Sequence, residues 1–180
     1  MFKTRLKLYQ VDAFTNQTFK GNPAAVCILE EWLEDGIMQK IAAENNLSET
    51  AFVVKENDFF VIRWFTPTTE VALCGHATLA AGHVLFLYYH YPGSRLHFYS
   101  PHSGDLYVSK KDNLLTLDFP TDNISRVDPP DQLMEAFDNK PVDIYKGRTD
   151  YLLVFESQKD IVNCRPDIEL LKKAKARGII

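Results

Sequence analysis

The residues best suited to chemistry lie in one short run, Leu73-Cys74-Gly75-His76-Ala77-Thr78, which opens a long apolar segment. A glycine at the start of a buried helix leaves unpaired backbone N–H groups facing any ligand above it. Such a helix end binds carboxylates, and it can stabilise the negative charge that develops as a proton leaves carbon. The amides of Gly75 and Ala77 and the side chain of His76 are therefore candidate substrate contacts. The competing interpretation is structural, with Gly75 permitting a tight turn and His76 capping the helix.

Two more side chains are candidates for acid–base or nucleophilic roles. Cys74 lies beside the expected helix N-terminus, where a thiol can have a lowered pKa, although an inert buried thiol is the commoner fate of cysteine. Glu49 lies in the polar run Ser48-Glu49-Thr50 between apolar neighbours. An apolar pocket raises a carboxyl pKa and makes the group a usable general acid or base. A solvated glutamate in a turn is the alternative for Glu49.

Motifs for other chemistries are missing from the sequence. There is no G-x-G-x-x-G, no P-loop and no G-x-S-x-G, so nicotinamide, nucleotide and serine-hydrolase functions lack their signatures. Four histidines lack metal-ligand spacing with one another or with a cysteine, and we therefore expect no metal. They are His83, His90, His97 and His102.

Composition excludes further classes of partner. The 180 residues are 46% hydrophobic and carry a net charge of −4, so no domain-wide basic field can hold nucleic acid or an anionic membrane. No apolar run reaches membrane-spanning length. The N-terminus lacks the pattern of a secretory signal, and the three well-separated cysteines suit reduced thiols, so we expect a cytoplasmic protein.

Hydrophobic periodicity predicts a mixed α and β first domain over residues 1–120. The segment 77–89 is apolar on nearly every face and lacks proline, as expected for a central helix enclosed by other structure. A second helix is expected from Asp35, as N-cap, to about residue 45. Strands are expected at 6–14, 24–29, 51–54, 59–66, 95–100, 105–110 and 114–119.

Residues 121–180 are expected to hold a linker and the incomplete start of a second domain. The polar, proline-containing stretch 121–130 fits a connection between domains. A short helix at 131–137, a strand at 151–155 and an amphipathic helix from Asp167 to about Ala176 follow it. Gly178 and two isoleucines then begin another strand. We therefore expect the natural protein to continue beyond residue 180.

Five sequence blocks occur in a fixed order along the chain. The blocks are Val11-Asp12-Ala13-Phe14, Phe19-Lys20-Gly21-Asn22-Pro23-Ala24-Ala25-Val26, Asn46-Leu47-Ser48-Glu49-Thr50-Ala51-Phe52, Arg63-Trp64-Phe65-Thr66-Pro67 and Cys74-Gly75-His76-Ala77-Thr78-Leu79. In this order they resemble the PhzF-type phenazine-biosynthesis-like proteins. A weaker match follows at Leu117-Asp118-Phe119-Pro120.

The resemblance implies an α+β, diaminopimelate epimerase-like fold: two similar domains, each a curled, mostly antiparallel sheet around a central helix. It also implies an isomerase of small carboxylate-bearing metabolites, active in the cleft between the domains without metal or organic cofactor. Glu49 would shuttle the proton, and Gly75 and His76 would contact the substrate. A homodimer is a further expectation from the family.

Two departures from the family keep other functions open. The family's second active-site cluster, an aspartate and a Gly-Ser segment, has no counterpart before Ile180. Cys74 aligns with one of the two catalytic cysteines of diaminopimelate epimerase, but Cys27 and Cys164 match no partner cysteine. The alternatives are an amino-acid epimerase or racemase using Cys74, and a truncated, non-catalytic binding module.

Overall fold

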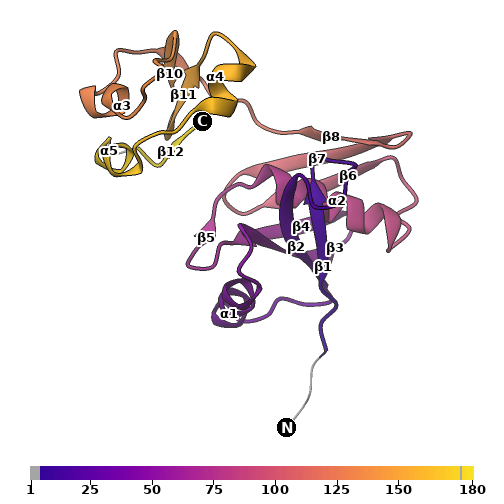
Figure 1. The fold of residues 1–180 in the computed structure, drawn as a ribbon. Coiled ribbons are helices and arrows are strands. Elements are labelled where there is room, and N and C mark those ends of the chain that lie inside the picture. The colour runs from indigo at the N-terminus through magenta and orange to yellow at the C-terminus, as the bar shows by residue number, and fades with distance from the viewer. Residues whose placement is uncertain (1–4, 175) are drawn as a thin grey trace. The chain divides into compact units, whose positions relative to one another are not determined.

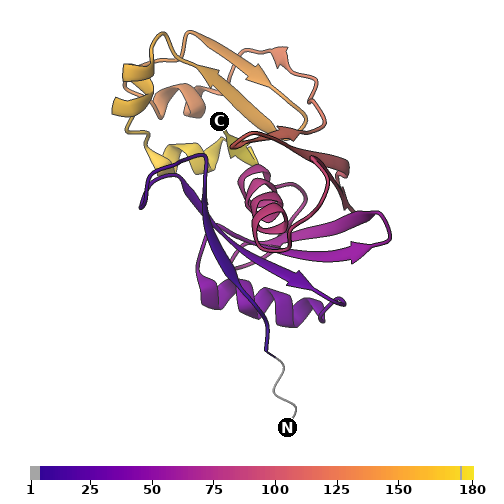
Figure 2. The ribbon, with the colours of Figure 1, turned by 90° about the vertical axis from the view of Figure 1, so that its right-hand side faces the viewer.

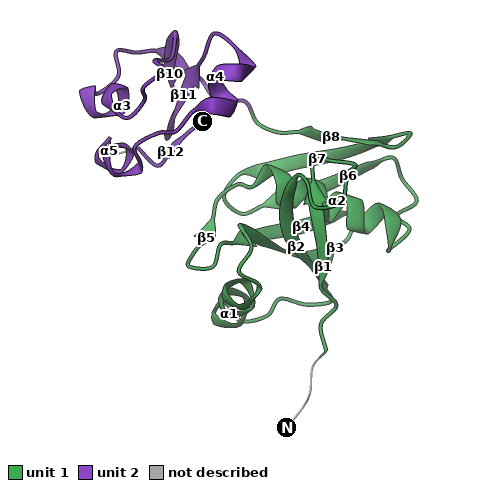
Figure 3. Ribbon diagram, viewed as in Figure 1, with its two compact units in different colours: residues 1–120 green, residues 121–180 purple. Residues whose placement is uncertain are grey.

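The computed structural model describes residues 5–174 and 176–180. Residues 1–4 and Lys175 lie outside the described residues. The expected absence of a secretory signal partly depends on residues 1–4, and Lys175 falls inside the expected last helix. The chain divides into two compact units, Met1–Pro120 and Thr121–Ile180, coloured separately in Figure 3.

The first unit is a curled sheet of eight strands with one helix, α2 (Gly75–Leu87), against its concave face (Figures 1 and 2). Its hydrogen-bonded order is β1-β2-β3-β4-β6-β7-β8, with β5 paired to β4. Only β2–β3 and β4–β6 pair in parallel among these neighbours. The strands are β1 (Tyr9–Ala13), β2 (Asn22–Leu29), β3 (Glu49–Glu56), β4 (Phe59–Phe65), β5 (Glu70–Val71), β6 (Arg95–Ser100), β7 (Gly104–Lys111) and β8 (Leu114–Asp118).

The central helix α2 is buried on almost every side, as its apolar sequence predicts. It packs against β1, β2, β3, β7 and β8. A Cβ atom at Gly82 would lie 2.8 Å from Val108 Cγ1, so glycine is what lets the helix approach β7 this closely.

A second helix, α1 (Asp35–Asn45), connects the parallel strands β2 and β3 and covers the other face of the sheet. Residues of β3 therefore alternate between two cores, with Ala51 and Val53 facing α2 and Phe52 and Val54 facing α1. This explains why β3 is apolar without alternation, since a strand covered on both faces has no polar side. The expected N-cap Asp35 is wrong, because the cap is Glu34 and the Asp35 carboxylate instead binds Arg63.

The second unit has a smaller sheet in the order β12-β11-β10-β9, with its own core. The expected strand near 151–155 and the strand at Gly178 pair in parallel as β11 and β12. The helix expected from Asp167 to about Ala176 is shorter than its amphipathic pattern predicts: α5 begins at Ile168 and ends at Lys173. The elements are β9 (Ser125–Arg126), α3 (Asp131–Glu135), β10 (Asp143–Lys146), β11 (Asp150–Val154), α4 (Gln158–Asn163), α5 (Ile168–Lys173) and β12 (Gly178–Ile179).

Within the described residues, no helix combines the length and apolar character needed to cross a membrane.

Candidate active site

Glu49 is the first residue of β3 and follows directly on the turn that ends α1. The C-cap of that helix, Asn46, has left-handed backbone angles (φ 51°, ψ 36°), which reverse the chain toward the sheet. The side-chain amide of Asn45 donates a hydrogen bond of 3.1 Å to Thr50 Oγ1, and Thr50 is buried. This bond ties the end of the helix to the start of the strand and thereby restricts the backbone that carries Glu49.

The start of α2 is held by its own backbone and one hydroxyl. Cys74 is the N-cap residue and has extended angles (φ −144°, ψ 114°). Its carbonyl oxygen accepts the first helical N–H, from Thr78, and also a hydrogen bond of 2.6 Å from Thr78 Oγ1. The buried Thr78 side chain therefore fixes the turn that presents Cys74 and His76.

The side chains of Glu49, Cys74 and His76 come together in one cluster. Nδ1 of His76 lies 3.4 Å from Cys74 Sγ, and Nε2 lies 3.3 Å from Glu49 Oε2. One ligand-type atom from each residue falls within 4.8 Å of the other two. The imidazole thus stands between a thiol and a carboxylate that are far apart in the sequence.

The cluster is unevenly exposed to solvent. The Glu49 side chain is 20% exposed, whereas that of His76 is 9% exposed and Cys74 is buried. The contact between His76 Nε2 and Glu49 is short but poorly aligned, so this buried nitrogen makes no hydrogen bond to any described residue. A ligand reaching the cluster would therefore meet the carboxylate first and an unsatisfied imidazole nitrogen behind it.

The pKa of the Cys74 thiol is raised to about 12, chiefly by burial and also by the adjacent Glu49 carboxylate, against a lowering by the backbone N–H of Ala77. Desolvation disfavours the charged thiolate more than one backbone amide can stabilise it. Cys74 is therefore a neutral thiol at physiological pH, and the lowered pKa that would mark a reactive cysteine is not found.

Gly75 and Ala77 both lie in the first turn of α2. Gly75 is the first helical residue of α2, and a Cβ atom there would meet only Leu117 and Phe119 at ordinary distances of 3.8 and 4.0 Å. A tight turn therefore does not explain the glycine. The backbone N–H of Ala77 lowers the pKa of the Cys74 thiol, so this amide acts on the cluster itself.

The sequence did not identify the two residues that hold this cluster in place, Asn45 and Thr78. Their positions gave a weak signal, since Asn45 precedes the helix end and Thr78 lies one turn after Cys74. Hydrogen bonds between side chains or from a hydroxyl to a carbonyl have no periodic signature, so only the coordinates identify them.

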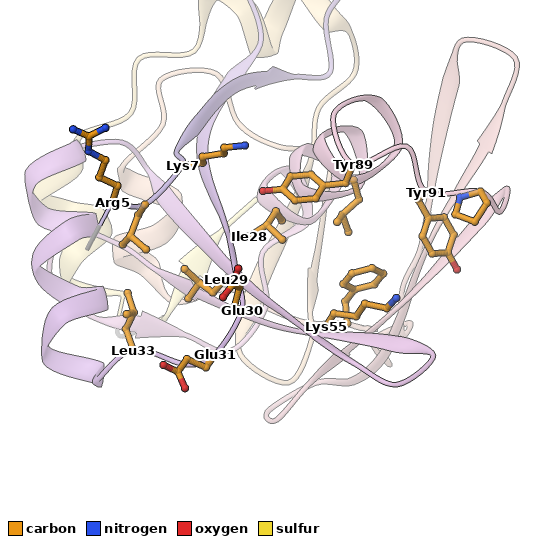
Figure 4. Close-up of a pocket in the computed structure, with 14 residues that line it drawn as sticks. Arg5, Lys7, Ile28, Leu29, Glu30, Glu31, Leu33, Lys55, Tyr89 and Tyr91 are labelled. Carbon is orange, nitrogen blue, oxygen red and sulfur yellow. The ribbon is translucent and has the colours of Figure 1, made fainter. Parts of the chain in front are cut away.

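A separate hollow of about 780 Å³ lies away from the cluster in the first unit (Figure 4). Its wall includes Ile28 near the end of β2 and Glu30 just after it, and Leu85 near the end of α2 and Tyr89 just after it. Glu49, by contrast, pairs with Ala24 near the beginning of β2. None of the five expected site residues lines this hollow.

Comparison with known proteins gives consistent matches over almost the whole chain. The family model described as phenazine biosynthesis-like protein matches residues 11–180. A Pseudomonas aeruginosa protein named an uncharacterized isomerase is 52% identical over 177 residues, which is 98% of this chain and 67% of that protein. A protein of the same name from Halalkalibacterium halodurans is 42% identical over 96% of this chain and 66% of its own length.

Solved structures give the same result for the fold. The crystal structure of a PhzF-family protein from Enterococcus faecalis matches with a TM-score of 0.85 and 46% identity, over 93% of this chain and 64% of that one. A predicted epimerase from Pseudomonas aeruginosa, at 21% identity, shares the fold with a TM-score of 0.70. The expected diaminopimelate epimerase-like fold is confirmed, and the chain spans about two thirds of the length of these relatives.

Proposed function

The chain belongs to the phenazine biosynthesis-like protein family, and from this premise we propose that it serves an isomerase that moves a proton within a small carboxylate-bearing metabolite. Glu49 is the group that takes and returns the proton, and His76 and the N-terminus of α2 stabilise the charge that develops meanwhile. Neither a metal nor an organic cofactor takes part. Two relatives are named isomerases, which supports this class of reaction.

The observation that carries the proposal is the unequal exposure within the cluster. Glu49 is its most accessible member, and its carboxylate lies 3.3 Å from the buried His76 Nε2. A general base must reach the proton it removes, and a neighbouring donor must already be oriented toward the developing charge. Glu49 meets the first need and His76 the second.

The closeness of Glu49 and Cys74 argues against the racemase alternative. A racemase with two bases holds them on opposite faces of the reacting carbon, since one removes a proton and the other delivers one. Here the carboxyl and the thiol lie within 4.8 Å of each other, on either side of one imidazole, and the thiol stays protonated to a pKa of about 12. This pair therefore favours transfer on one face by a single carboxylate.

The test of Glu49 is a conservative replacement in the complete protein. Small carboxylates incubated in heavy water, followed by NMR, identify a substrate by solvent deuterium incorporation and double-bond migration. Glu49→Gln keeps the size of the side chain and removes its basicity, so turnover should fall by about 100-fold or more. Glu56→Gln, exposed at the far end of the same strand, is the matched control and should keep full activity.

Two results would count against the proposal. Full activity in Glu49→Gln would exclude this carboxylate as the proton carrier. Exchange of an amino-acid α-hydrogen that is lost in Cys74→Ser would instead favour the racemase alternative. The melting temperature of each variant, compared with that of the unmodified protein, separates loss of chemistry from loss of fold.

A further inference from the structure

The three side chains of the cluster are also a suitable ligand set for a metal ion. A thiol, an imidazole and a carboxylate, from Cys74, His76 and Glu49, supply one sulfur, one nitrogen and one oxygen. This mixture suits zinc, which takes all three ligand types, better than calcium or magnesium, which prefer oxygen. Three protein ligands also leave a fourth tetrahedral position open to water or a small ligand.

The distances within the cluster are close to those of a tetrahedral site. With bonds of about 2.0 to 2.3 Å, a tetrahedral zinc ion separates its ligand atoms by about 3.3 to 3.6 Å. His76 Nε2 and Glu49 Oε2 already lie 3.3 Å apart, and the three ligand atoms lie within 4.8 Å of one another. Cys74 Sγ lies 3.4 Å from the other ring nitrogen of His76, Nδ1, so a common centre for all three ligands needs a change of side-chain conformation at Cys74 or His76.

A second observation indicates that one nitrogen of the cluster is free to bind a metal ion. Nε2 of His76 is buried and has no hydrogen-bond partner among the described residues, although it faces the Glu49 carboxylate. Leaving a buried polar atom unpaired is unfavourable, and coordination to a metal would satisfy it. The Glu49 side chain is 20% exposed, so an ion from solvent can reach its carboxylate.

From these features we propose that Glu49, Cys74 and His76 form an inhibitory binding site for a thiol-preferring divalent cation such as Zn²⁺. Binding breaks the S–H bond of Cys74 and forms a sulfur–zinc bond, and the proton passes to solvent. No electron is transferred. The inhibitory part of the inference rests on the proposed function, because zinc would occupy the carboxylate that carries the substrate proton.

Zinc binding is measured first without any substrate. The purified protein, freed of metal by dialysis, competes with a chromophoric chelator for added Zn²⁺. We expect one ion per chain, and a loss of affinity of about 100-fold or more in Cys74→Ser, because a direct ligand matters more than an outer partner. Cys164→Ala, which removes a half-buried thiol elsewhere in the fold, is the control and should bind as tightly as the unmodified protein.

A spectrum tests which atom binds the ion. Co²⁺ in place of Zn²⁺ should give a sulfur-to-cobalt charge-transfer band that is present in Cys164→Ala and absent in Cys74→Ser. If Cys74→Ser does not fold, Cys74→Ala replaces it, with circular dichroism as the check. Equal affinity in the Cys74 variants, or no binding of Zn²⁺ at micromolar concentrations, would overturn the proposal.

The binding and activity experiments fail independently of each other. If zinc binds but the protein has no isomerase activity, the metal site stands and the proposed function does not. If the protein is an active isomerase that Zn²⁺ neither binds nor inhibits, only the metal inference is wrong. Inhibition should be reversed by a chelator, since no covalent modification of Cys74 is involved.

Discussion

The carboxylate of Glu49, at the start of a strand, lies 3.3 Å from Nε2 of His76, in the first turn of the central helix. The strand and the helix belong to the same curled sheet unit, and neither side chain is fully exposed. The pair therefore places a carboxylate and a neighbouring imidazole nitrogen on a rigid support.

Replacing His76 should slow the chemical step more than it weakens substrate binding. In His76→Asn the carboxamide keeps a polar group near Glu49 but removes the imidazole that stabilises the developing charge. We expect kcat to fall by about 10- to 1,000-fold. Steady-state kinetics on an identified substrate check this, and a change confined to KM would show that His76 only binds the substrate. Replacement of the exposed His90 is the control and should change neither constant.

The three cysteines should differ sharply in reactivity. Burial raises the pKa of Cys27 to about 11 and that of Cys74 to about 12, whereas Cys164 is only half-buried. Alkylation of the native protein by iodoacetamide at pH 8 should therefore modify Cys164 first. Mass spectrometry of the digested protein measures this, and rapid modification of Cys74 would contradict the assignment of a buried neutral thiol.

Stability should decline at alkaline pH because of the buried thiols. The pKa of Cys27 is about 11 in the folded protein against an ordinary value of 9.0, so its contribution is fully present below pH 9. As pH rises toward 11, the unfolded chain loses this proton while the folded chain keeps it. The free energy of unfolding should then fall by up to about 1.4 kcal/mol per pH unit. Urea unfolding of Cys27→Ala at pH 8 and pH 10.5 should show a smaller decline than that of the unmodified protein.

Removing the Arg63 side chain should lower the free energy of unfolding more than removing an exposed arginine of the same sheet. Its guanidinium donates two hydrogen bonds of 2.7 Å to Glu70 and one of 2.8 Å to Asp35, and it stacks over Trp32 and Phe65. The pKa of the Asp35 carboxyl is lowered by its hydrogen bond to Arg63. Arg63→Ala should cost about 2 to 3 kcal/mol of unfolding free energy.

The matched control for Arg63 is Arg95→Ala. The Arg95 side chain is 55% exposed, and that of its partner Asp118 is 66% exposed. An exposed pair of this kind contributes about 1 kcal/mol or less. Thermal and urea unfolding should rank the two variants in this order, and equal losses would show that Arg63 does not brace α1 against β4 and β5.

The local elements of the first unit follow from its sequence because each has a strong periodic signal. The apolar run after Gly75 predicts the central helix, and the strand at residues 95–100 agrees in both bounds. The two-residue strands β5 and β9 and the short helix α4 were not predicted, since elements this short carry no periodicity. Pairing order is also not local, so the parallel pairs β2–β3 and β4–β6 became known only from the coordinates.

For the site, the sequence by itself determined which groups are chemically able to act, because Glu49, Cys74 and His76 stand out by residue type and by family motif. Their roles in a reaction stay predictions. Tertiary structure decided that they meet, since the register of β3 and the start of α2 bring one ligand-type atom of each residue within 4.8 Å of the other two. It also decided the state of Cys74, because a thiol pKa depends on burial and neighbouring charge, and neither can be read from the order of residues along a chain.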